Sequence, residues 1–189
     1  MKKLNLGFVM CGSFCTLSKA IDKMEILSEK YNIIPVMSDN VYSMDTKFGK
    51  AVDFINRVEK ICNKKIIHSI PDAEPIGPKK LADIVLVAPC SGNTLAKLSH
   101  GITDSPALMA IKSHLRIKRP VVITLATNDA LGISAKNIGT MLNTKNIYFV
   151  PLKQDDFKNK PNSMIADFDL IPQTLELALE SKQIQPIFK

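Results

Sequence analysis

Hydrophobic and polar residues follow two alternating patterns along the chain, short apolar runs and longer amphipathic stretches. The runs predict buried strands, and stretches with apolar residues three or four positions apart predict helices. We expect strands at 4–10, 33–37, 83–88, 121–125 and 147–150, with a short further one at 66–67. We expect helices at 16–29, 48–60, 93–100, 105–118, 135–142 and 172–183. This alternation predicts an α/β fold with a mainly parallel sheet of about six strands and helices on both faces.

Three segments refine this prediction. Residues 84–88 are all apolar, as a strand covered on both faces must be, so they are the expected centre of the sheet. Pro89 is expected to end that strand, and a proline-rich connector at 71–78 precedes it. In the helix at 48–60, the apolar positions expected to face the core are Phe48, Ala51, Val52, Ile55 and Val58.

The length and composition indicate one folded domain over residues 1–189. A content of 46% hydrophobic and 23% charged residues excludes a disordered or coiled-coil chain. No apolar run approaches the roughly 20 residues that span a bilayer, and the basic start at Met1–Lys3 leads into a first strand rather than a signal peptide. We therefore expect a cytoplasmic protein without a membrane span.

Charge and metal-ligand patterns narrow the choice of ligand. The net charge of +7 comes from lysines spread along the chain, without a dense basic tract, so we expect no nucleic-acid binding and a preference for small anions. The four cysteines form no disulfide framework, which suits a reducing compartment. His68, His100 and His114 are scattered without zinc-ligand spacing, so we expect no metal site and treat each as a single buried or solvated residue.

Two loops that follow predicted strands contain candidate binding residues. Ligands of open α/β sheets bind beyond the carboxyl ends of the strands. The first loop holds Gly12 and Ser13, and the loop after the central strand holds Ser91, Asn93 and Thr94 at the start of a helix. Backbone N–H groups there suit a phosphate, although neither loop has a complete dinucleotide fingerprint. Helix capping is the commoner role of a short Gly-Ser turn such as that at 12–13, and it is an equal interpretation for the side chains of the second loop.

These loops also show a family resemblance. Pro89-Cys90-Ser91-Gly92-Asn93-Thr94 resembles the P-A-S-A-N-T motif of the homo-oligomeric flavin-containing cysteine decarboxylases, and 97–104 resembles the K-x-x-x-G-x-x-D that follows it. Within that superfamily the chain is most similar to the family of dipicolinate synthase B subunits. The segments that support this similarity cover nearly the whole chain: 39–41, 46–49, 73–78, 103–106, 127–132, 160–164 and 170–174.

The resemblance implies a three-layer, Rossmann-like flavoprotein fold with FMN beside the two loops. Carried over by position, the candidate cofactor-binding residues are Gly12, Ser13, Ser38, Pro89, Ser91, Gly92, Asn93, Thr94 and Asn128. Cys90 and Gly92 replace the two alanines of the motif, so small size is preserved there. A ring system is therefore expected to approach this loop closely.

Two departures from the superfamily pattern affect the expected chemistry. The decarboxylases have a catalytic histidine before the motif, where this chain has Glu74-Pro75-Ile76, and His68 lies too far upstream to replace it. Their P-x-M-N-x-x-M-W segment corresponds to 126–131, which clearly keeps only Asn128. We therefore expect no cysteine decarboxylation and a different substrate.

The resemblance implies a protein that acts with the A subunit of dipicolinate synthase to oxidise a dihydrodipicolinate-type precursor to dipicolinate, pyridine-2,6-dicarboxylate, during sporulation. NADP is expected on the A subunit, FMN on this chain is the alternative hydride acceptor, and a homo-oligomer is expected. The catalytic residues are not identified. The charges available for a small anionic dicarboxylate are Lys47, Glu74, Asp104, Arg116 and Asp129, each with a surface or capping role as the alternative.

Two other functions remain open from the sequence. One is an FMN-dependent decarboxylase or flavin prenyltransferase that acts alone, and the other is a non-catalytic partner that only stabilises the A subunit. The first would act without a partner, and the second would need no cofactor.

Overall fold

The computed structural model describes residues 3–189, so Met1 and Lys2 of the basic start lie outside it. A seven-stranded sheet forms the middle layer, in the order β2-β1-β3-β4-β7-β6, with β5 also paired to β4. The strands are β1 (Asn5–Met10), β2 (Asn32–Met37), β3 (Ile84–Cys90), β4 (Val121–Thr127), β5 (Ile147–Phe149), β6 (Leu152–Lys153) and β7 (Met164–Ala166). The strands β1 to β5 pair in parallel, and only the β4–β7 and β6–β7 pairs are antiparallel.

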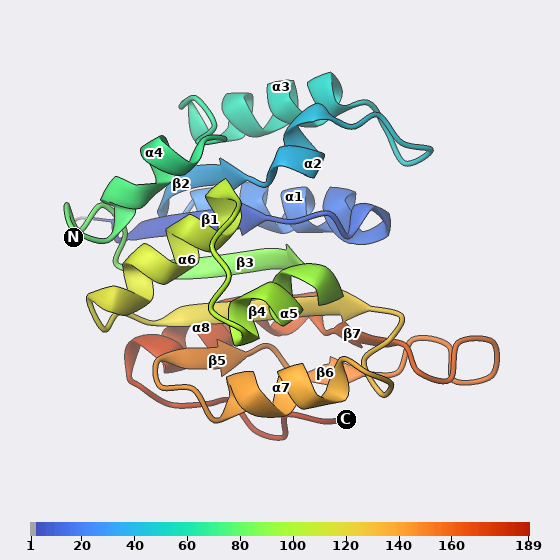
Figure 1. The fold of residues 1–189 in the computed structure, drawn as a ribbon. Coiled ribbons are helices and arrows are strands. Elements are labelled where there is room, and N and C mark those ends of the chain that lie inside the picture. Colours follow the sequence, from blue (N-terminus) through green and yellow to red (C-terminus); the bar gives the residue numbers. More distant parts are fainter. Residues whose placement is uncertain (1–2) are drawn as a thin grey trace.

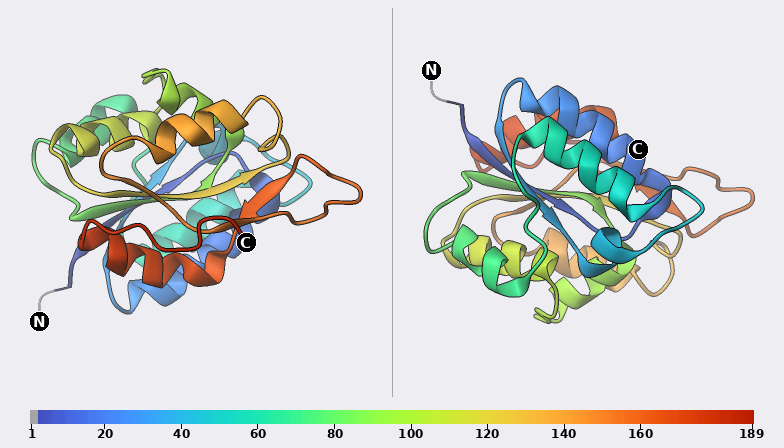
Figure 2. Two further views of the ribbon diagram at one scale, coloured as in Figure 1. Left: turned by 90° about the horizontal axis from the view of Figure 1, so that it is seen from below. Right: turned by 90° about the horizontal axis from the view of Figure 1, so that it is seen from above.

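Helices cover both faces of this sheet, which completes the three layers (Figures 1 and 2). The helices α1 (Phe14–Ser28), α3 (Ala51–Cys62) and α8 (Ile171–Leu179) lie on one face. The helices α5 (Gly92–Ser99), α6 (Pro106–Arg116) and α7 (Ala135–Leu142) lie on the other. Shorter elements join them: α2 (Asp39–Ser43), α4 (Ile70–Ala73) and two 3-10 turns, η1 (Glu74–Ile76) and η2 (Phe168–Leu170). The expected α/β architecture is confirmed.

The central strand is β3, as the sequence predicts. All seven of its residues are buried, and it pairs with β1 on one side and β4 on the other. It does not end at Pro89, however, but continues to Cys90 through a register shift between Val87 and Cys90. Because Pro89 lies in this irregular stretch, its missing N–H costs no regular ladder bond.

Several local predictions are wrong. Residues 66–67 form only an isolated bridge, between Ile67 and Val36. The helix expected from residue 48 begins at Ala51, and both Phe48 (48% exposed) and Val52 (52% exposed) face solvent. The physical reason is that α3 packs on α1 and α2 near the margin of the fold, so only a narrow stripe of it is covered. The expected connector at 71–78 instead contains helical turns, α4 and η1.

The parallel order brings the carboxyl ends of β1, β3 and β4 to one edge of the sheet. The loops that leave those ends lie next to the protruding loop between β6 and β7, which is drawn in orange-red in Figure 1. Among residues 3–189, no helix has both the length and the apolar character needed to cross a membrane.

Candidate functional site

Two adjoining cavities lie at this edge of the sheet. The larger has a volume of about 1070 Å³ and the smaller about 200 Å³. Three residues, Gly12, Ser91 and Asn93, line both cavities. The two loops identified in the sequence therefore lie between the two cavities. The larger volume is in the range of pockets that hold cofactors and other small molecules.

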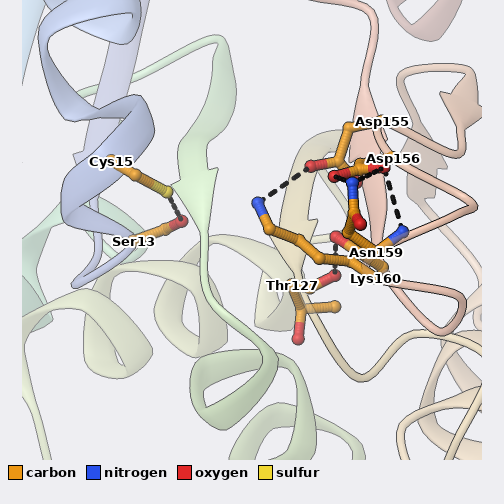
Figure 3. A network of polar contacts seen from close by, with 8 residues as sticks. Ser13, Cys15, Thr127, Asp155, Asp156, Asn159 and Lys160 are labelled. Atoms are coloured by element: carbon orange, nitrogen blue, oxygen red, sulfur yellow. Dashed lines mark hydrogen bonds and ion pairs between the residues drawn. The ribbon is translucent and has the colours of Figure 1, made fainter.

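Five segments form the walls of the larger cavity. They are the β1–α1 loop with the start of α1, the α2–α3 loop at Lys47 and Phe48, the β3–α5 loop with α5, the β4–α7 loop with the start of α7, and the β6–β7 loop with the start of β7. Figure 3 shows Ser13 and Cys15 of the first segment, Thr127 at the end of β4, and Lys160 of the last segment with its ammonium directed toward the side on which Ser13 and Cys15 lie. The Ser163 hydroxyl donates to the Thr127 carbonyl over 3.4 Å, which ties the protruding loop to the sheet.

The β1–α1 loop is held by backbone contacts that leave its helix start open. The Cys11 N–H donates to the Pro89 carbonyl over 3.1 Å, which fixes this loop against β3. Ser13 precedes α1 but makes no side-chain capping bond; instead the Thr16 hydroxyl donates to the Ser13 carbonyl at 3.0 Å. An anion is therefore not blocked from this helix start by a capping side chain.

The β3–α5 loop uses part of its motif for helix capping. Ser91 Oγ accepts from the Thr94 N–H at 3.2 Å, which caps α5, and lies 3.0 Å from the Thr94 hydroxyl oxygen Oγ1. Asn93 is exposed and lines both cavities. At Gly92 a Cβ would lie 2.6 Å from Thr127 Oγ1, so the small size of this residue is required by the neighbouring strand end.

The smaller cavity contains an unsatisfied hydroxyl. Ser38, directly after β2, lines it, and its Oγ is buried without a hydrogen-bond partner among the described residues. Thr94 lines the same cavity, as do Lys97 and Asp104, which form an ion pair at 2.6 Å. Buried polar groups in native folds are nearly always satisfied, so Ser38 marks a place where a polar ligand atom fits.

The structure thus brings eight of the nine candidate cofactor residues to the two cavities. Asn128 lines the larger one, together with Gly12, Ser13 and the 91–93 segment. Pro89 is the exception, because it is buried within β3 and lines neither cavity. Its carbonyl oxygen instead accepts the hydrogen bond from the Cys11 N–H that fixes the β1–α1 loop.

The candidate charges separate into two groups. Lys47 and Asp129 line the larger cavity, and Asp104 lines the smaller one, whereas Glu74 and Arg116 line neither. The position that corresponds to the superfamily histidine therefore lies away from both cavities.

Further charged and polar side chains, not named as binding candidates from the sequence, line the larger cavity, although His100 and Lys160 lie in the similar segments 97–104 and 160–164. Lys136 and Asn137 come from α7, Asp155 and Lys160 from the β6–β7 loop, and His100 from the end of α5. Asp155 and Lys160 form an ion pair at 3.8 Å. Because these three segments are far apart in the sequence, only the folded chain brings them together.

Two thiols beside this region are unreactive. Burial raises the pKa of Cys11 to about 11 and the pKa of Cys90 well above its usual range, so both stay protonated at neutral pH. Cys15 instead lines the larger cavity.

Within residues 3–189 no group of three or more His, Cys, Asp or Glu side chains is arranged to hold a metal ion.

Sequence comparisons show which known proteins this chain resembles. The flavoprotein family model matches residues 1–170. The dipicolinate synthase B subunit of Bacillus subtilis (strain 168) is 43% identical over 188 residues, which cover 99% of this chain and 94% of that protein.

Solved structures extend the comparison. The crystal structure of the dipicolinate synthase B subunit from Bacillus halodurans C has a TM-score of 0.90 and 41% identity, covering 98% of this chain and 96% of that one. The FMN-dependent cysteine decarboxylase SpaF has a TM-score of 0.68 at 17% identity, covering 94% of this chain and 97% of that one. The last similarity shows a common fold alone.

Proposed function

The chain belongs to the flavoprotein family and is a full-length homologue of the dipicolinate synthase B subunit, and from this premise we propose that it acts with a partner A subunit to oxidise a dihydrodipicolinate-type precursor to dipicolinate. The single observation that carries the proposal is that the similarity extends over the whole chain, cavity-forming loops included. A homologue that shared only the core of the fold would not be expected to keep these loops.

The charges of the larger cavity support a dicarboxylate substrate. Lys47, Lys136 and Lys160 reach it from three different segments, and the only carboxylates among its lining residues are Asp129 and Asp155. Lysine ammonium groups form charge-assisted hydrogen bonds with carboxylates, and an excess of positive charge raises the local concentration of an anion. An aromatic ring with two carboxylates is chemically matched to such a cavity.

We further propose that FMN binds at the two cavities. The unpartnered hydroxyl of Ser38, the uncapped start of α1 and the joint lining by Gly12 and Asn93 all suit a ligand with a phosphate and a polar chain. Ser13, Ser91 and Asn128 would complete the contacts. When bound, FMN would supply an alternative hydride acceptor to the nicotinamide dinucleotide expected on the partner.

A test of the function compares the two purified proteins separately and together. Dipicolinate formation is followed with a dihydrodipicolinate-type substrate and NADP, and product is expected only when both proteins are present. Product from the partner alone at the same rate would leave no role for this chain. Product from this chain alone would favour an enzyme that acts without a partner.

The cofactor proposal has a separate test. Removing the Ser38 hydroxyl is expected to weaken FMN affinity about 10- to 100-fold, as for loss of a hydrogen bond to a charged group. The test is Ser38→Ala with flavin fluorescence titration. The matched control is Ser28→Ala at the end of α1, where the serine lines neither cavity and its hydroxyl donates to the Glu25 carbonyl. Equal affinities for wild type and Ser38→Ala would place the cofactor elsewhere.

The absence of a histidine at 74–76 leads to one more expected result. The FMN-loaded chain should release no carbon dioxide from a peptidyl-cysteine or phosphopantothenoyl-cysteine substrate, because Glu74 lines neither cavity. Release that disappeared in Glu74→Gln would instead identify a decarboxylase.

A further inference from the structure

His100 has a geometry that distinguishes it from the other two histidines. It follows α5 and lines the larger cavity. Its Nδ1 lies 2.8 Å from the Ala96 carbonyl oxygen. Because a carbonyl oxygen only accepts hydrogen bonds, this contact favours the tautomer with the proton on Nδ1, which leaves the lone pair of the neutral ring on Nε2.

The orientation of this ring is supported from two helices. Ser99 Oγ lies 3.1 Å from the same Nδ1, and its single proton is shared between two acceptors, the Ala96 carbonyl oxygen at 2.8 Å and Asn137 Oδ1 at 3.0 Å. Asn137 is buried in α7 and also lines the cavity. The imidazole is thus held at its Nδ1 side by α5, which is itself connected to α7, while no described residue forms a hydrogen bond with Nε2.

The carboxylates and lysines of the cavity are less suited to accept a proton. Asp155 is paired with Lys160, and Asp129 is engaged in its own loop, where it accepts from the Ser134 hydroxyl at 3.4 Å. The lysines are cations that attract carboxylates. An imidazole with a fixed tautomer is, by contrast, the usual side chain for proton transfer near neutral pH.

We propose that His100 is the general base of the oxidation, with Nε2 removing a proton from the ring of a dihydrodipicolinate-class substrate. This rests on the proposed function. One ring C–H bond breaks and its hydrogen leaves with both electrons, as hydride, to a nicotinamide dinucleotide held by the partner protein. Another ring hydrogen leaves as a proton to Nε2, and the electron pair of that bond completes the aromatic ring. Lys47 and Lys136 hold the substrate through its carboxylates.

The test uses the complex of both proteins. His100→Asn retains a short amide that can donate to the Ala96 carbonyl but has no base, and His100→Ala leaves space for added imidazole. For His100→Asn we expect kcat to fall about 100-fold or more, the range for loss of a general base, with KM within about threefold of wild type. In His100→Ala we expect imidazole to restore turnover. His68→Asn, at an exposed histidine that stacks on Tyr42 and lines neither cavity, should match wild type.

The outcomes separate the role of His100 from the function on which it rests. A wild-type complex that forms dipicolinate while His100→Asn keeps its kcat overturns the role of His100 alone. Loss of activity in both His100 variants without rescue by imidazole, accompanied by a lowered melting temperature, assigns His100 to helix capping and also overturns the proposal. A wild-type complex without product overturns the proposed function and this inference together.

Discussion

Acidification is expected to destabilise the fold through His114, the histidine in the last turn of α6. Its side chain is 0% exposed, and both ring nitrogens lack a hydrogen-bond partner among residues 3–189. Burial, and next the positive charge of Arg119, lower the pKa of His114 to about 4. The helix C-terminus favours a cation, but burial outweighs that effect here.

The sign and size of the effect follow from this pKa. In the unfolded chain the imidazole titrates near its ordinary pKa of about 6.5, so between about pH 6.5 and 4 the unfolded state binds the extra proton. His114 therefore contributes stability that is fully present above about pH 6.5 and is lost as the pH falls to about 4. A difference of roughly 2.5 pKa units corresponds to about 3 kcal/mol, with a slope approaching 1.4 kcal/mol per pH unit.

The measurement is reversible urea unfolding of wild type and His114→Leu at several pH values, followed by circular dichroism because the chain has no tryptophan. Leucine has a similar size and removes both unpaired nitrogens, so the variant should be close to wild type or more stable at pH 7. Between pH 7 and 4 it should lose about 3 kcal/mol less than wild type. His68→Asn is the control and should keep the wild-type slope. Identical pH dependences for wild type and His114→Leu would refute this account of His114.

Three glycine substitutions test the packing around the sheet, each with urea unfolding. Gly77→Ala should cost about 3 kcal/mol or more, because its Cβ would lie 1.9 Å from the Ser113 carbonyl oxygen, which belongs to a helix backbone and cannot move freely. Gly139→Ala is the matched contrast: no atom lies within 4 Å of its Cβ, so a better helix former at this position of α7 should add about 0.5–1 kcal/mol. Gly92→Ala should lower both stability and dipicolinate formation through its contact with Thr127, and Thr127→Ala in the same chain should restore stability.

The fold was largely predictable because its centre obeys one simple rule. A strand covered on both faces must be apolar throughout, and 84–88 in β3 shows that pattern without ambiguity. Elements near the margin gave weaker signals. In α3, Val52 continues the apolar pattern yet is exposed, and the strands β6 and β7, two and three residues long, are too short to produce any periodicity. Their pairing depends on contacts between distant segments, which local patterns do not contain.

The candidate site was predictable only where a motif marked it. The loop at 89–94 was found from its resemblance and its polar residues, but the same pattern could not separate capping from binding, and Ser91 does cap its helix. Lys136 carried no signal, because one lysine in a lysine-rich chain is distinguished only by where the fold places it, and Lys160 lay in the similar segment 160–164 without being named as a candidate.

The histidines show most directly why residue type alone does not specify chemistry. His100 and His114 are each single histidines near the end of a helix, and from sequence both are equally expected to be core or surface residues. Folding buries His114 and leaves its ring nitrogens unpartnered among the described residues, and burial together with the charge of Arg119 makes the charged form unfavourable. It places His100 at a cavity, where the Ala96 carbonyl fixes the proton on one nitrogen and directs the lone pair to the other. A proton acceptor requires this combination of access and a fixed tautomer. The tautomer follows from the Ala96 carbonyl one turn earlier in α5, and the access follows from the position of the end of α5 at the cavity, rather than from the histidine itself.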